Sequence, residues 1–87
     1  MAKYHFNIVD KRGVVPDEEG SNFRFFRQAL REAKESARDL AKHLMETRTA
    51  LLDQCVEITD ETGRVLAALP VVEVLKHPNF PRFQDQC

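Results

Sequence analysis

Six Lys and Arg side chains recur every three or four residues between positions 24 and 42, the spacing that places side chains on one face of an α-helix. We call this set the basic ridge: Arg24, Arg27, Arg31, Lys34, Arg38 and Lys42. Such a ridge can bind consecutive phosphates of a nucleic acid. The candidate nucleic-acid contacts are Arg27, Arg31, Lys34, Arg38 and Lys42. Carboxylates four residues on, such as Glu35 after Arg31 and Glu46 after Lys42, favour the alternative of a solvated helix face with ion pairs.

Two acidic segments, residues 17–19 and residues 60–61, have the side chains needed for acid-base catalysis or for binding a divalent ion. Their spacing matches no calcium-binding loop. Acidic residues before a helix interact favourably with its N-terminal dipole, and an Asp at position 60 suits a turn. We therefore interpret both segments as structural.

The remaining reactive side chains form no recognisable catalytic or metal-binding motif. His5 is expected on a strand face, the serines lack a glycine-flanked elbow, and the three glycines are spread over three turns. The histidines and cysteines have no zinc-ligand spacing, so we assign no metal and no cofactor. Cys55 and Cys87 are expected to be free thiols. The sequence thus predicts a protein that is not an enzyme.

Two β-hairpin corners share the pattern Ile-x-Asp-x-x-Gly-x-Val, which begins at Ile8 and again at Ile58. In each corner the Asp can accept a hydrogen bond from the turn backbone, and the Gly tolerates a positive φ. Alternation predicts a first strand over residues 4–10, followed by a short edge strand at residues 14–15. The second corner is expected to pair Thr59 with Arg64 and Ile58 with Val65.

A long helix is predicted between the two hairpins, because apolar residues from position 26 onward recur in steps of three and four. Ser21 or Asn22 is its expected N-cap, and it should end between Thr47 and Thr49. Residues 71–76 suit a second, short helix. The predicted core contains Tyr4, Phe6, Ile8, Phe26, Leu30, Ala33, Ala37, Leu40, Leu44, Val56, Ile58, Val65, Ala67 and Leu69.

The second hairpin has apolar residues on both of its faces, and Leu66 and Ala68 lie on the face away from the predicted core. That face is expected to be covered by the C-terminal segment or by a second subunit. The tail, with Phe80 and Phe83 between prolines, supplies two aromatic anchors for docking on this face or on a neighbouring chain. The candidate interface is therefore Leu66, Ala68, Phe80 and Phe83.

The composition excludes several classes of protein. The formal net charge of the 87 residues is −1, so no overall field attracts nucleic acid or an anionic membrane. The first six residues have no apolar signal-peptide core, and no run of eighteen apolar residues occurs. We expect a soluble, cytoplasmic protein with no membrane partner.

The chain resembles a family of small uncharacterised bacterial proteins, annotated only by a domain of unknown function and common in soil alphaproteobacteria. The resemblance spans roughly residues 3 to 71. It rests on the strand beginning Tyr4-His5-Phe6, the Asp-x-Glu-Gly segment at residues 17–20, the alanine-spaced helix, and Ile-Thr-Asp-x-x-Gly-Arg-Val-Leu from residue 58. It implies a fold and a bacterial cytoplasmic origin, but no catalytic residue. At the level of fold alone, the pattern is also similar to HicB-type antitoxins, whose sheet and alanine-rich helix dock a toxin.

Together these observations predict an α+β protein with the order β-β-α-β-β. A four-stranded antiparallel sheet carries one long helix on one face, followed by a short C-terminal helix and an extended tail. We assign residues 1–71 to a single domain and residues 72–87 to the short helix and the Pro/Phe tail. The expected function is a non-enzymatic interaction or regulatory module that forms a homodimer or binds a protein partner. The alternative is a nucleic-acid-binding or antitoxin-like regulator that uses the basic ridge.

Overall fold

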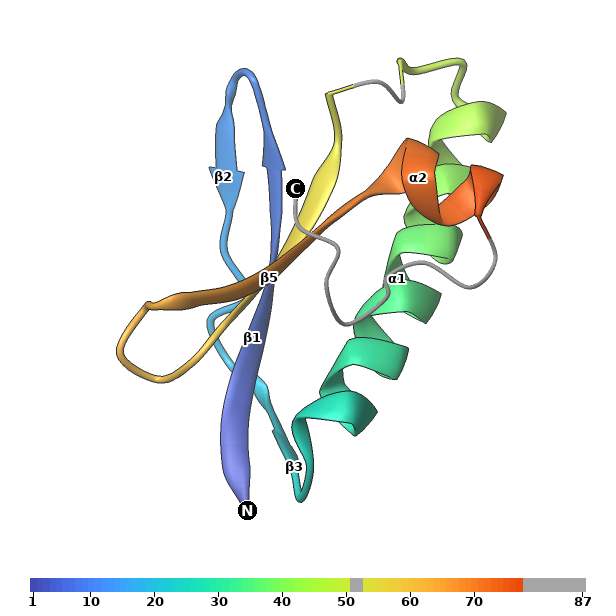
Figure 1. The fold of residues 1–87 in the computed structure, drawn as a ribbon. Coiled ribbons are helices and arrows are strands. Elements are labelled where there is room, and N and C mark those ends of the chain that lie inside the picture. Colours follow the sequence, from blue (N-terminus) through green and yellow to red (C-terminus); the bar gives the residue numbers. More distant parts are fainter. Residues whose placement is uncertain (51–52, 78–87) are drawn as a thin grey trace.

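The fold has two layers, a twisted antiparallel sheet and a long helix that lies across one of its faces (Figure 1). The computed structural model describes residues 1–50 and 53–77. In chain order its elements are β1 (Ala2–Asp10), β2 (Gly13–Val15), β3 (Ser21–Phe23), α1 (Phe26–Glu46), β4 (Cys55–Thr59), β5 (Val65–Pro70) and α2 (Val71–Lys76). The α+β class, the antiparallel sheet, the long helix and the short second helix are confirmed.

The sheet has five strands, one more than predicted, and β1 lies at its centre. The strand order is β2-β1-β4-β5, and β3 pairs with the first residues of β1. β2 pairs with the far end of the same edge of β1, from Ile8 to Asp10, whereas β3 pairs with residues 2–4. The predicted short edge strand is therefore confirmed, and a second short strand follows it.

Helix α1 begins later than predicted, and its cap is different. Ser21 and Asn22, the expected N-caps, belong to β3, and the N-cap is Phe25. The side-chain oxygen of Gln28 accepts hydrogen bonds from the backbone N–H groups of Phe25 and Arg24, at 3.0 and 3.1 Å. A glutamine three residues after the N-cap can satisfy such N–H groups even where the cap residue itself is apolar.

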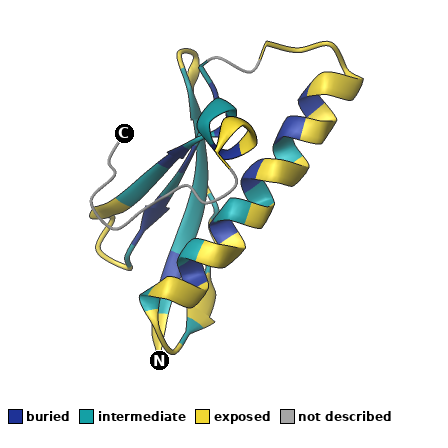
Figure 2. Cartoon of the chain, turned by 45° about the vertical axis from the view of Figure 1, so that its right-hand side comes forward, coloured by how far each residue is buried: buried dark blue, intermediate teal, exposed yellow. Residues whose placement is uncertain are grey.

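Alanines bring α1 close to the sheet. Ala29, Ala33, Ala37 and Ala41 are fully buried, whereas the larger Leu30 and Leu40, predicted as core residues, are only partly buried at the sides of this stripe. Figure 2 shows the buried residues of α1 turned toward the sheet and the exposed ones turned away from it. The sheet side of the core consists of Tyr4, Val56, Ile58 and Leu69, and α2 adds Val71 and Val74.

The two corners use the predicted turn chemistry. The Asp10 side chain accepts a hydrogen bond from the backbone N–H of Arg12 at 2.8 Å, and Asp60 accepts one from Thr62 at 2.9 Å. In the second corner Gly63 has a φ of +87°, and its N–H bonds the carbonyl of Asp60. The glycine is needed there because side-chain-bearing residues rarely adopt a positive φ.

The predicted register of the second hairpin is wrong. Thr59 pairs with Val65 and Ile58 pairs with Ala67, so Leu66 is an extra residue in β5. Such a β-bulge changes which side chains face the core. Val65, predicted to be buried, is 49% exposed, while Ala67 and Leu69 still face α1.

Among the described residues, no helix has both the length and the apolar character needed to cross a membrane.

Helix α1 ends in a Schellman motif that has arginine where glycine is usual. The N–H of Thr49 bonds the carbonyl of Leu44, and the N–H of Arg48 bonds that of Met45. Arg48 has a φ of +57°, in the left-handed region. We predict that Arg48→Gly raises the free energy of unfolding by about 0.5 to 1 kcal/mol, because the left-handed conformation strains a residue with a Cβ. Urea unfolding checks this, with Arg48→Ala as the control that keeps the strain.

Acid should destabilise the protein partly through the second corner. The hydroxyl of Thr62, together with the backbone N–H groups of Arg64 and Thr62, lowers the pKa of Asp60 from 3.8. The stabilisation from this lowered pKa is therefore complete above pH 3.8 and is lost as the pH falls through the lower folded-state value. We predict that Asp60→Asn loses less of its neutral-pH stability than the wild type between about pH 4 and about pH 2. Urea unfolding at each pH measures the free energy of unfolding of both proteins. An equal loss in the two proteins would contradict the prediction.

Candidate functional site

The sheet face opposite α1, which we call the outer face, carries an apolar row that crosses four strands. Val14 of β2 pairs with Val9 of β1, Val9 pairs with Cys55 of β4, and Cys55 pairs with Pro70 of β5. Paired residues in antiparallel strands point to the same side of the sheet. These four residues, the apolar row, therefore lie side by side on the outer face, and Val14 is 57% exposed.

The remaining rows of the outer face are polar at their β1 and β4 positions and apolar on β5. Asn7, Glu57 and Ala68 form the second row, and His5, Thr59 and Val65 form the third. Of the predicted interface residues, the register puts Ala68 on this face, and Leu66 is exposed at the bulge. Phe80 and Phe83 lie outside the described residues.

A single carboxylate holds the β2–β3 connection against the middle of β1. One oxygen of Asp17 accepts the backbone N–H of Phe6 at 3.1 Å, and the other accepts the N–H of Gly20 at 3.2 Å. The N–H of Asp17 donates to the side chain of Asn7 at 2.8 Å. Because β2 and β3 pair only with the two ends of β1, the Asp17 side chain takes the place of a strand partner between them.

This role differs from the predicted one. The acidic residues at 17–19 were expected to meet the N-terminus of the helix, but α1 begins only at Phe26, and its first turn contains no acidic residue. Asp17 instead bonds a strand that precedes it by eleven residues. Its position in an Asp-x-Glu-Gly segment was the sequence signal for a turn, but not for this contact.

His5 is fixed next to the same connection. Its Nδ1 lies 2.6 Å from the backbone carbonyl of Asp17. A carbonyl only accepts hydrogen bonds, so Nδ1 must carry the proton. A Cβ at Gly20 would lie 2.9 Å from both the His5 ring and the carbonyl of Tyr4, and Gly20 has a φ of +70°. Both the space and the backbone conformation therefore require glycine at this position.

The polar groups of this cluster are used to hold the fold. The Asn7 amide also donates to the Thr59 hydroxyl at 3.3 Å, which links β1 to β4 through their side chains. In the described part of the chain, no three His, Cys, Asp or Glu side chains are grouped so that they could bind a metal ion. Of the two cysteines expected to be free thiols, Cys87 lies outside the described residues.

The basic ridge runs along α1 and ends, toward the start of the helix, at an exposed aromatic ring. The guanidinium carbons of Arg24 and Arg27 lie 5.8 and 5.2 Å from the centre of the Phe25 ring, which is 48% exposed. Burial, together with the nearby positive charge of Arg38, lowers the pKa of Lys34 from 10.5. Sequence reasoning missed Phe25, which belongs neither to the basic ridge nor to the apolar positions of the predicted helix.

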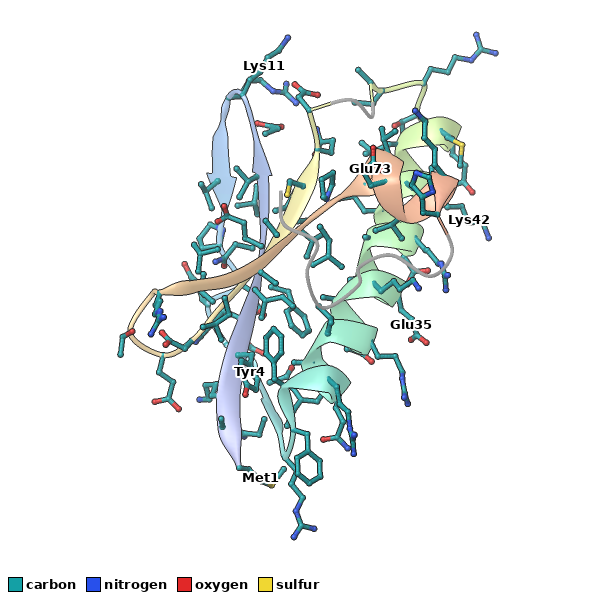
Figure 3. The ribbon with its side chains drawn as sticks, in the orientation of Figure 1. Met1, Tyr4, Lys11, Glu35, Lys42 and Glu73 are labelled. Atoms are coloured by element: carbon teal, nitrogen blue, oxygen red, sulfur yellow. The ribbon has the colours of Figure 1, made fainter. Side chains whose placement is uncertain are left out.

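The structure does not form the ion pairs expected between Arg31 and Glu35 and between Lys42 and Glu46. Within residues 1–50 and 53–77, Arg12 forms an ion pair with Asp10, and His77 lies 3.4 Å from the Glu73 carboxylate. Arg31 and Lys42 therefore lie more than 4.0 Å from the carboxylates of Glu35 and Glu46. In Figure 3, Glu35 and Lys42 extend from α1 on the side away from the sheet.

A substitution at Asp17 tests how much this carboxylate stabilises the fold. Asp17→Asn turns one acceptor into an NH₂ group that faces a backbone N–H, so we predict a loss of about 1 to 3 kcal/mol in the free energy of unfolding. Glu18→Gln, an exposed neighbour, is the matched control and should change it by no more than about 0.5 kcal/mol. Urea unfolding measures both. Equal effects at the two positions would show that Asp17 has no special role.

The comparison with known proteins identifies a family but no activity. No curated protein and no solved structure matches the chain. A family model, the domain of unknown function DUF6894, matches residues 3–72. These residues include β2 to β5 and all of β1 except its first residue, with the Asp17 cluster and the outer face. The chain therefore belongs to the DUF6894 family.

Proposed function

We propose that this chain is a non-enzymatic interaction module that forms a homodimer through its outer face. The observation that carries the proposal is the apolar row, which crosses four strands on the face that α1 leaves uncovered. Val65 and Leu66 add exposed apolar surface at the other edge of the sheet. Contiguous apolar surface of this kind favours association with another protein surface.

Charge favours a second copy of the chain as the partner. The β1–β2 corner, residues 10–13, carries a formal charge of +1, and residues 60–64 of the β4–β5 corner carry −1. The two corners lie at opposite ends of the sheet, and Lys11 marks the tip of the first (Figures 1 and 3). A two-fold axis in the plane of the outer face, running across the strands, brings each positive corner of one copy over the negative corner of the other.

A non-enzymatic role is supported by how the polar side chains are used. The oxygens of Asp17, the Nδ1 of His5 and the amide of Asn7 all make structural hydrogen bonds. A shallow hollow of about 430 Å³ lies at the start of α1 and includes none of these residues. We place the protein in the cytoplasm.

Two adjacent valines of β2 provide a matched test. Val14 and Val15 are 57% and 65% exposed, but they point to opposite sides of the sheet, and only Val14 is on the outer face. We predict that the wild type is a dimer at high concentration and that Val14→Glu weakens association at least about tenfold, because it places a charge in an apolar contact. Val15→Glu should leave association unchanged.

Light scattering coupled to size-exclusion chromatography measures the mass of each variant over a range of concentrations. A wild type that stays monomeric at the highest concentration would contradict the dimer. Equal weakening by both substitutions would contradict the assignment of the outer face.

Binding of nucleic acid along the basic ridge is a second candidate function. It is favoured by the separation of Arg31 and Lys42 from the carboxylates that were expected to pair with them. From Arg27 to Lys42 the ridge extends for about 22 Å at the helical rise of 1.5 Å per residue. The ridge lies on α1, away from the outer face, so a dimer through that face leaves it accessible.

A further inference from the structure

We infer that the start of the basic ridge is a binding site for single-stranded nucleic acid, in which the Phe25 ring and its two arginines form a surface for stacking a base. The inference rests on the second candidate function, binding along the ridge, and goes beyond it by naming the form of nucleic acid and the residue that selects it.

Phe25 lies at the junction of β3 and α1, where a ring of this size is not needed by the core. It is 48% exposed, and the core cluster instead contains its neighbours Phe23 and Phe26 as partly buried members. Tyr4 packs on those two rings, at 6.2 and 5.7 Å between ring centres. The side chain of Phe25 is therefore an apolar surface that the fold leaves exposed to solvent.

The arginines around this ring add planar, positively charged surfaces. Guanidinium groups of Arg24 and Arg27 lie within 6 Å of the ring centre, the range of a cation–π interaction. Unpaired bases stack both on aromatic rings and on guanidinium planes. The same two arginines carry the charge that phosphates require, so base and backbone can be bound at one place.

A hollow lined by Arg24 connects the start of the basic ridge to Arg31. Its volume is about 430 Å³, within the usual range of small-ligand sites, and its lining includes Arg24, Arg31, Asn22 and Glu32. The two arginines outnumber the single carboxylate of Glu32, so the charged side chains of the lining are net positive and attract a phosphate of a bound strand.

The arrangement favours a single strand over a duplex. In a duplex the bases are stacked on each other, and a side chain on a helix surface reaches only their edges. A stacking surface next to a line of cations is the combination used for single strands, and stacking adds affinity that depends little on sequence. A duplex of equal length gains only the phosphate contacts.

The test uses fluorescence anisotropy of the full chain with a labelled oligothymidylate, and with a mixed-sequence DNA duplex of the same length, at low salt. We expect tighter binding of the single strand. Phe25→Leu, which keeps an apolar side chain but removes the ring, should weaken single-strand binding at least about fivefold and leave duplex binding unchanged. Phe25→Tyr, which keeps the ring, should retain single-strand affinity.

Charge variants test whether the phosphates are bound by the arginines at the start of the ridge. Arg27→Gln should weaken binding of both oligonucleotides and reduce the salt dependence by about one ion. Lys76→Gln, at an exposed cation of α2, is the matched control and should change neither the affinities nor the salt dependence. Circular dichroism of each variant checks that the fold is retained.

Four results would overturn the inference. Equal affinity of Phe25→Leu and the wild type for the single strand, or duplex binding as tight as single-strand binding, would remove the stacking role and leave ridge binding in place. Displacement of the oligonucleotide by polyglutamate at equal charge concentration would show that the site binds polyanions in general and does not select nucleic acid. No binding of either oligonucleotide at low salt would overturn both the inference and the second candidate function.

Discussion

The fold depends on the two hydrogen bonds that the Asp17 carboxylate accepts from backbone N–H groups of Phe6 and Gly20. They hold the connection between two three-residue strands against the centre of β1. Strands this short cannot hold their own register, because each contributes only a few ladder hydrogen bonds. With the carboxylate in place, one stretch of chain pairs with both ends of the same strand edge, and β1 is supported along its length. Gly20 is required in that connection because the chain passes so close to His5 and Tyr4.

This frame separates the two surfaces on which the proposed functions rest. The alanine stripe of α1 packs tightly on one face of the sheet. This face is therefore buried in the core. The opposite face keeps the apolar row, and the solvent side of α1 keeps the basic ridge. Because the two surfaces lie on different layers, occupation of one leaves the other available. Self-association and binding of a nucleic acid are thus compatible in one small protein.

Periodic patterns made most of the architecture predictable. The alternation in β1 and β4, the helical spacing of α1, the Asp and Gly positions of both corners and the short α2 all appear as predicted. The failures are at places where structure depends on distant residues. A three-residue strand such as β3 has too few positions to show alternation, and its pairing with β1 is a long-range contact. The bulge at Leu66 is likewise set by how β5 pairs with β4, and no characteristic residue type marks it in the sequence.

The candidate site was predictable only in part, for the same reason. The ridge follows from helical spacing, and the outward direction of Ala68 follows from alternation, because both periods are local. Predicting the apolar row would require the register of three strand pairs, because only that register brings Val9, Val14, Cys55 and Pro70 together. The role of Asp17 needs the three-dimensional path of the β2–β3 connection, and that of Phe25 needs the actual start of α1.

The most direct test of the outer face as the self-association surface is a dilution series followed by amide chemical shifts in NMR. From about 1 mM to about 10 μM, the account predicts concentration-dependent shifts for the amides of Val9, Val14, Cys55 and Glu57. The amides of α1 that face solvent should stay unchanged. Shifts confined to α1, or a spectrum that does not change over the whole series, would contradict it.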